Sequence, residues 1–344
     1  RVYERCGERR NRAKARLKFL VEQMGWEVFQ QRVLAERPIV WATQSGYSLL
    51  AQPVAPVEPS PVHPAAASEP TGMAGDDAVF QRWVATNVHQ QKQAGCMSVL
   101  VRVPLGDLSA AQLRGLAATA RRHAAEVRLT NEQDVLLRFV QASSLGTVYE
   151  DMQRLRLAEA GAGRLVDITR CPGADTCLSA ITHPRGLAAA LEPLFSNGLS
   201  AWADAPLSIK ISGCPNSCGH HPIADLGFFG MALKVEKRHL PCYQILVGGH
   251  TEEGRAVFGE RLLRVPARRV PEAVERLMKL YADQRQPEES FANFVTRVGL
   301  DALRAPLQDL ADLSRAAEED EALFVDLGTT EPFQLEAGKG ECAA

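Results

Sequence analysis

Two pairs of cysteines constrain this chain more than any other feature of its sequence. The first pair bounds the stretch C-P-G-A-D-T-C, from Cys171 to Cys177, and the second lies in S-G-C-P-N-S-C-G-H-H, at Cys214 and Cys218. Glycine and proline interrupt both stretches, which is typical of loops. Four thiolates carried by two loops suit an iron–sulfur cubane, because such a cluster takes four cysteine ligands. The spacing therefore favours a cluster-binding site.

The residues alone leave two other interpretations of the cysteines open. Zinc could use the same ligands, although zinc modules usually place two to four residues between the members of a pair and the first pair here has five. Buried, inert thiols are common in proteins, but they explain neither the pairing nor the loops. Two disulfides are disfavoured, because we recognise no secretion signal and cytosolic thiols stay reduced. Four further cysteines have no partner at ligand spacing and are left out of the cluster: Cys6, Cys96, Cys242 and Cys342.

The two loops resemble the C-terminal half of the sirohaem-containing nitrite and sulfite reductases. C-P-N-S-C-G, followed by A-D-L-G-F-F-G at 224–230, is the most specific signature, together with V-R-V-P-L-G-D-L at 101–108 and E-V-R-L-T-N-E-Q at 126–133. The similarity extends from about Phe80 to Gly299 and recurs weakly at the N-terminus. It implies an α+β fold, with a ferredoxin-like half-domain followed by a sirohaem/[4Fe–4S]-type domain and preceded by the end of a first such half.

A chain of 344 residues is long enough for two or three domains. Residues 51–72 contain repeated prolines and no helical or strand period, which indicates an extended spacer. We expect five segments: the end of a first sirohaem-type half at 1–50, a Pro/Ala-rich linker at 51–75, a ferredoxin-like half-domain at 76–157, a [4Fe–4S]/sirohaem-binding domain at 158–300 and a less organised acidic extension at 301–344.

Hydrophobic periodicity gives the expected elements. The basic stretch 8–24 is predicted to be a helix, which in the family closes the first half. In the half-domain we expect strands at 98–104, 127–130, 135–140 and 164–169, and helices from Ser109 to His123 and from Ser144. In the following domain we expect strands at 207–212, 223–235, 242–247 and 262–265 and helices at 185–195, 270–284 and 289–298.

The resemblance also implies roles for individual residues. Cys171, Cys177, Cys214 and Cys218 would ligate the cluster, and Cys218 would in addition bridge to the sirohaem iron. Asn216 would hydrogen-bond the cofactor or a sulfur. Three polar residues of the half-domain match positions that approach the macrocycle in the other copy of the family's repeat: Arg102, Arg128 and Gln133. His220 and His221 could donate protons, but exposed or internally hydrogen-bonded histidines are the commoner case.

The implied activity is the assimilatory six-electron reduction of sulfite to sulfide, or of nitrite to ammonia, at a coupled sirohaem–[4Fe–4S] centre. Sulfite is slightly preferred. Ferredoxin is the expected donor, since no flavin or nicotinamide fingerprint occurs in the sequence, with a separate flavoprotein as the other option. The alternatives are a precorrin-3B synthase-like cluster enzyme and a non-catalytic, metal-stapled module. The chain begins with Arg1, so we expect a C-terminal fragment, with the anion-binding arginines and lysines upstream of it.

Composition excludes other classes of function. The net charge of −2 argues against nucleic acid as a partner, because binding domains for nucleic acid are usually basic. No apolar run approaches the roughly 20 residues that a membrane span needs. We therefore expect a cytoplasmic oxidoreductase whose substrate is a small inorganic anion.

Overall fold

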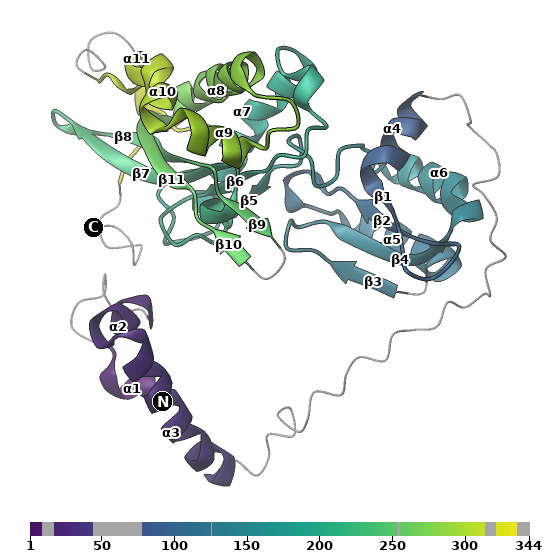
Figure 1. The fold of residues 1–344 in the computed structure, drawn as a ribbon, viewed down its shortest axis with the longest axis horizontal. Coiled ribbons are helices and arrows are strands. Elements are labelled where there is room, and N and C mark those ends of the chain that lie inside the picture. The colour runs from purple at the N-terminus through teal and green to yellow at the C-terminus, as the bar shows by residue number, and fades with distance from the viewer. Residues whose placement is uncertain (9–16, 44–77, 125, 253–254, 314–320, 336–344) are drawn as a thin grey trace. The chain divides into compact units, whose positions relative to one another are not determined.

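The computed structural model describes residues 1–8, 17–43, 78–124, 126–252, 255–313 and 321–335 (Figure 1). The chain divides into two compact units, one formed by Arg1–Pro59 with Glu336–Ala344 and the other by Ser60–Leu335. The Pro/Ala-rich linker that we expect at 51–75 lies outside the described residues. Among the described residues, no helix is long and apolar enough to cross a membrane.

The first unit contains helices α1 (Val2–Cys6), α2 (Leu17–Met24) and α3 (Trp26–Thr43). Of the basic helix expected at 8–24, residues 17–24 form α2, Glu8 is not helical, and 9–16 lie outside the described residues. The sequence did not predict α3, because its apolar residues are not confined to one face and give no helical period. Trp26 and Trp41 are more than half exposed.

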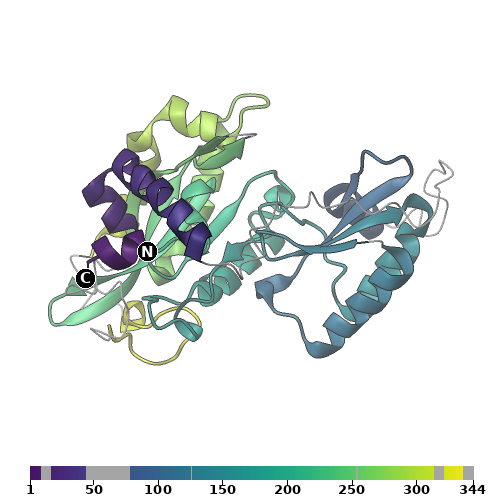
Figure 2. The same ribbon diagram turned by 90° about the horizontal axis from the view of Figure 1, so that it is seen from below.

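The half-domain is a four-stranded antiparallel sheet with its helices packed on one side (Figure 2). Its elements in chain order are α4 (Ala78–Asn87), β1 (Val88–Gln90), β2 (Cys96–Val101), α5 (Ala110–His123), β3 (Glu126–Leu129), β4 (Val135–Gln141) and α6 (Leu145–Leu155). The strand order is β1-β2-β4-β3. As predicted, Ser109 caps α5: its hydroxyl accepts the Gln112 N–H, and the Gln112 side chain accepts the Ser109 N–H.

The expected strand at 164–169 is wrong. Strand β1 supplies the fourth strand of this sheet, and only Thr169 from the expected segment is in a strand, β5 (Thr169–Arg170), which belongs to the other sheet. The apolar residues that suggested the strand, Leu165 and Ile168, are instead buried in the core of the following domain.

The domain that follows the half-domain has its helices and sheet strands within residues 169–311 and is here called the cluster domain. It is built on a five-stranded sheet of order β11-β8-β7-β6-β5. Its other strands are β6 (Ile209–Ser212), β7 (Leu226–Val235), β8 (Arg238–Val247) and β11 (Glu260–Pro266), and a separate pair is formed by β9 (His250–Glu252) and β10 (Arg255–Val257). The β5–β6 and β6–β7 pairs are parallel, whereas the β7–β8 and β8–β11 pairs are antiparallel. The fold class is α+β, as predicted.

Helices cover one face of this sheet (Figure 1). They are α7 (Pro184–Ser196), α8 (Val270–Gln284), α9 (Phe291–Val298), α10 (Leu300–Arg304) and α11 (Gln308–Ala311). The boundary that we expect at 301 falls inside this core, because Leu303, Leu307 and Leu310 are buried in it. The many acidic residues beyond 301 made the helical spacing of these leucines hard to recognise in the sequence.

Candidate functional site

Both cysteine loops leave the same edge of the five-stranded sheet. Strand β5 ends at Arg170, directly before Cys171, and its parallel neighbour β6 ends at Ser212, two residues before Cys214. The carboxyl ends of parallel neighbours meet at one edge, which is the usual place for a ligand in such sheets. The Cys171 N–H continues the ladder by donating to the Ile211 carbonyl at 3.0 Å.

Glycines allow the two loops to touch through their backbones. A Cβ on Gly213 would lie 3.0 Å from the Gly173 Cα and 2.9 Å from the Thr182 carbonyl oxygen. Gly173 itself has φ +63°, where glycine is favoured, and packs against Pro184. The Gly213 carbonyl accepts the N–H groups of Ile181 and Thr182 at 2.8 and 3.1 Å. These contacts fix the first loop against the second.

The four cysteines divide into two buried and two exposed thiols. Cys171 and Cys214 are buried, while Cys177 and Cys218 are exposed. Burial raises the pKa of Cys171, the N–H groups of Gly213 and Gly173 oppose this by hydrogen-bonding the sulfur, and the nearby charges of Cys218 and Cys177 raise it further. The Gly213 N–H lies 3.1 Å from the Cys171 Sγ. The fold therefore places the thiols of the two loops so close that charge on Cys218 in the second loop raises the pKa of Cys171 in the first.

Four thiolates on two loops are a donor set that suits a cubane. Within the described ranges, no group of three or more His, Cys, Asp or Glu side chains is arranged to hold one metal ion. A cubane binds one thiolate per iron, so its four sulfurs need not converge on one point. The Gly213 N–H directed at the Cys171 sulfur is the kind of hydrogen bond that tunes cluster potential. The donor set and the backbone around it thus suit the group.

The side chain of Ser212 supports the second loop through two polar contacts. Its hydroxyl accepts the Gly219 N–H at 3.0 Å and lies 2.9 Å from the His221 Nδ1. His221 is buried with its ring tilted against that of Phe229, and burial, reinforced by Arg261, lowers the pKa of its imidazole to about 4. It is therefore a neutral, internally bonded histidine near neutral pH.

The remaining residues that we singled out in this loop are accessible. His220 is exposed and has φ +58°, in the left-handed region. Asn216 is half-buried. Its hydrogen bond to a cofactor or a sulfur stays a prediction.

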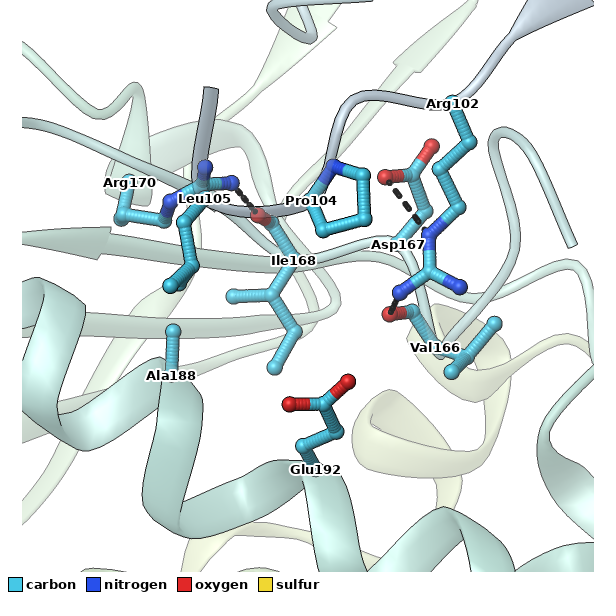
Figure 3. A pocket seen from close by; sticks show the side chains of 9 residues that line it. All are labelled: Arg102, Pro104, Leu105, Val166, Asp167, Ile168, Arg170, Ala188 and Glu192. Carbon is cyan, nitrogen blue, oxygen red and sulfur yellow. Dashed lines mark hydrogen bonds and ion pairs between the residues drawn. The ribbon is translucent and has the colours of Figure 1, made fainter. Parts of the chain in front are cut away.

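Arg102 lies buried where the half-domain meets the cluster domain (Figure 3). Its guanidinium donates to the Val166 carbonyl at 2.8 Å and to the Glu159 carboxylate at 3.1 Å, and lies 3.5 Å from Asp167 Oδ1. All three partners follow the half-domain in the chain. Arg102 therefore joins the two folds, and its contact with a macrocycle stays a prediction.

Gln133 reaches the same junction. Its Nε2 donates at 2.6 Å to the carbonyl of Arg170, the residue before Cys171, and its buried Oε1 has no hydrogen-bond partner among the residues described. Arg170 is buried as well, and burial lowers the pKa of its guanidinium to about 10. Arg128 differs, because it lies on the edge strand β3 with its side chain 45% exposed and pairs with Glu126 at 2.8 Å. Cofactor contacts by Gln133 and Arg128 stay predictions.

Sequence reasoning missed the charged groups that support the site. Arg170 and Lys210 are buried in β5 and β6, and the Lys210 Nζ lies 3.4 Å from the Glu132 carboxylate of the half-domain. The one available signal was a charged residue inside a short apolar strand directly before each cysteine loop. Such a residue is rarely buried unless it is paired.

Two family models match the chain, each over one of the folds just described. The nitrite/sulfite reductase ferredoxin-like half domain matches residues 89–155, and the nitrite and sulphite reductase 4Fe-4S domain matches residues 161–312. The chain belongs to the nitrite and sulfite reductase family. The resemblance of the cysteine loops is thereby confirmed.

Relatives of this reductase family cover most of the chain. A ferredoxin–nitrite reductase of Synechococcus elongatus is 28% identical over 80% of this chain and 48% of its own length, and one of Zea mays is 30% identical over 72% and 40%. A ferredoxin sulfite reductase of Mycobacterium tuberculosis is 26% identical over 88% and 50%. The solved structure of the Mycobacterium tuberculosis NirA protein superposes with a TM-score of 0.61 at 25% identity, covering 87% of this chain and 50% of that one. The chain spans about half the length of the curated relatives that it matches.

Proposed function

We propose that this chain carries the cluster-binding half of a reductase that adds six electrons to sulfite or nitrite. The observation that supports this most strongly is the pair of cysteine loops, which leave adjacent parallel strands and touch through Gly173 and Gly213. In this proposal Cys171, Cys177, Cys214 and Cys218 ligate a [4Fe–4S] cluster. When bound, the cluster and a sirohaem would supply electrons one at a time to the anion.

The chain's own residues have distinct tasks in this proposal. The buried Cys171 and Cys214 would lie on the protein side of the cluster, and the exposed Cys177 and Cys218 on its open side. Exposure of Cys218 suits the bridging role that the family resemblance implies. The Gly213 N–H would stabilise negative charge on the Cys171 sulfur. Ser212 would keep the second loop in place through Gly219.

The finer assignments belong to the same proposal. Ferredoxin is the proposed donor, in keeping with the ferredoxin-dependent relatives, and sulfite is the first anion to test, with nitrite second. Arg102, Arg128, Gln133 and Asn216 are the proposed contacts to the macrocycle. The linker at 51–75 would connect the two copies of the repeat, and a cytoplasmic location is proposed with them.

Purification under anaerobic conditions, followed by iron, zinc and acid-labile sulfide assays, tests the proposal. We expect about four irons and four sulfides per chain for the cluster, and a fifth iron with a chlorin-type red band if sirohaem is bound. C218S should lose most of the iron, whereas C6S, which changes a cysteine outside the two loops, should keep it. Zinc without sulfide, or equal iron in the two variants, would contradict the proposal. Four irons and a bound precorrin instead of sirohaem would favour the precorrin enzyme.

A further inference from the structure

A segment far from the cysteines in sequence reaches the base of the first cysteine loop. Residues 321–335, here called the strap, pack against strand β8 on the sheet face opposite the helices (Figure 2). Arg238 binds both carboxylate oxygens of Glu321, at 2.7 and 2.8 Å, and its guanidinium lies 3.6 Å from the centre of the Phe324 ring. Phe324 is buried. The strap is therefore anchored on the sheet before it turns toward the loop.

Beyond this anchor, the strap inserts a fully buried carboxylate at the start of helix α7. Asp326 Oδ2 accepts the backbone N–H of His183 at 2.8 Å and lies 3.0 Å from the His183 ring Nδ1, while Oδ1 accepts the Leu327 N–H at 2.8 Å. His183 is the N-cap residue of α7. A negative charge is favourable there, because the N-terminus of a helix carries partial positive charge.

From the other side, His183 faces the first cysteine loop. Its Nε2 lies 3.8 Å from Oδ1 of Asp175, which lies between Cys171 and Cys177. The two residues that flank His183 also touch the loop: a Cβ on Gly173 would lie 2.0 Å from the Pro184 Cδ and 2.8 Å from the Thr182 carbonyl oxygen. A displacement of His183 would therefore be transmitted to the loop through both backbone and side chain.

The charges around the imidazole favour its protonated form. Asp326 faces it from the strap and Asp175 from the loop, and Arg185 of α7 lies 3.6 Å from Asp175 and also pairs with Asp107 of the half-domain. The hydrogen bond to Asp326 is the main reason that the pKa of His183 is raised. The other ionisable groups close to Asp326, Cys242 and Tyr243, are buried and remain uncharged, because burial raises the pKa of each.

We propose that Asp326 and His183 are a positioning pair, through which the strap holds the first cysteine loop in its cluster-binding conformation and places an imidazolium beside it. The part of this inference that concerns the cluster rests on the proposed function. His183 is a positioning residue in this scheme, because it acts on the cluster through the loop and through its charge. Among the residues described, two contacts join the strap to the start of helix α7: this pair, and the close backbone contact of Gly186 with Leu327 and Gly328.

The first experiment needs no cluster. The full chain is labelled with ¹³C-histidine, and the imidazole of His183, assigned by its absence in H183Q, is titrated by NMR in the apo protein. We expect a pKa above the ordinary value of about 6.5 in the wild type and a fall toward that value in D326N. E331Q is the matched control, since it also neutralises one carboxylate of the strap but changes an exposed residue that belongs neither to the Arg238–Glu321 anchor nor to the Asp326–His183 pair. If the pKa of His183 is the same in D326N as in the wild type, the proposed pairing of His183 with Asp326 is wrong.

The second experiment follows the cluster in the anaerobically reconstituted full chain. We expect D326N to lose iron to a chelator about tenfold faster than the wild type, in line with the loss of a charge-assisted hydrogen bond, and E331Q to match the wild type. The cluster's midpoint potential should fall as the pH rises through the pKa of His183, because the imidazolium favours the reduced, more negative cluster. H183Q should remove this pH dependence.

The outcomes separate the two proposals. A wild-type chain that takes up no cluster would refute the proposed function, while the histidine titration would still decide the Asp326–His183 pair. Equal rates of iron loss in D326N and E331Q, or an unchanged slope of potential with pH in H183Q, would overturn the positioning role. If D326N does not fold, the slope of potential against pH in H183Q still tests the charge of His183, because the Gln amide can donate to Asp326 without the positive charge.

Discussion

Gly213 lies where the backbones of the two cysteine loops are in contact. Its replacement by alanine would place a Cβ 2.9 Å from the Thr182 carbonyl oxygen, 3.0 Å from the Gly173 Cα and 3.2 Å from the Ala180 Cβ. Two of these three atoms belong to backbone, which cannot move aside as a flexible side chain can. We therefore expect G213A to lower the free energy of unfolding by about 1–3 kcal/mol, the usual cost of overpacking, and to reduce the iron bound after reconstitution.

Gly198 provides the matched control for this substitution. A Cβ there would meet only the Glu275 side chain, at 3.0 Å from its carboxylate oxygen, and that side chain can rotate away. G198A should therefore keep wild-type stability and iron content, measured by urea unfolding and by an iron assay. Equal behaviour of G213A and G198A would show that the loops do not depend on close backbone contact.

For single residues, the sequence was enough to predict the four cysteines as a site, but not the contacts that hold their loops. The four cysteines could be recognised because both pairs lie within short loops, so their spacing is a local property. The partnership of His183 with Asp326 spans 143 positions, and neither residue lies in a motif that indicates the other. Contacts of this kind depend on how the strap crosses the sheet, which periodicity does not reveal.

The turn between β3 and β4 places the buried carboxyl of Asp134 where the half-domain meets the cluster domain. Asp134 accepts the Val103 N–H at 2.9 Å. Burial raises the pKa of Asp134, and the charge of Asp167 together with a hydrogen bond between the two carboxyls raises it further. The folded protein therefore keeps a proton on Asp134 at a pH where the unfolded chain, with an ordinary carboxyl pKa near 3.9, has released it.

The sign of the resulting pH dependence follows from linkage. From about pH 4 up to the raised pKa of Asp134, the folded state binds more protons than the unfolded state, so this group lowers the free energy of unfolding as the pH rises, by up to about 1.4 kcal/mol per pH unit. D134N imitates the protonated acid and keeps the acceptor for Val103. Urea unfolding between pH 5.5 and 7.5 should accordingly show a flatter slope in D134N than in the wild type.

Asp309 serves as the control carboxylate for this measurement. Its pKa is lowered by the hydrogen bond to Arg276, so it is ionised in both the folded and the unfolded state throughout that pH range. D309N should leave the slope of stability against pH unchanged. A slope in D134N that equals that of the wild type would mean that Asp134 is ionised in the folded protein.

Elements with a clear period were predictable, and those formed by tertiary context were not. Helix α8 has the predicted bounds, because apolar residues such as Val270, Val274 and Leu277 recur at helical spacing and are buried. Strand β5 has two residues and exists only because β6 lies beside it, so its own sequence carries no strand signal. Helix α3 lacks a buried face among its described residues, and periodicity could not identify it.

At the scale of the whole chain, the half-domain and the cluster domain belong to one compact unit, and two arginines of the half-domain bind carboxylates beyond it. Arg82 binds Asp204 at 2.6 Å, with the two side chains 49% and 37% exposed. Arg102 lies 3.5 Å from Asp167, with the two side chains 10% and 7% exposed. The two pairs thus link the same folds but differ in burial.

Burial should decide how much each pair matters. An exposed ion pair contributes about 0–1 kcal/mol, because water and salt screen it, whereas removal of one partner of a buried pair costs about 3–5 kcal/mol, because the other charge is left unpaired in the interior. We therefore expect R102M to lower the free energy of unfolding by several times as much as R82M, measured by urea unfolding at neutral pH.

The same two variants, reconstituted with sirohaem, address the predicted cofactor contact of Arg102. A stable R102M that still binds the macrocycle would argue against both roles of that residue, whereas a destabilised R102M with unchanged binding would assign Arg102 to the junction of the two folds alone.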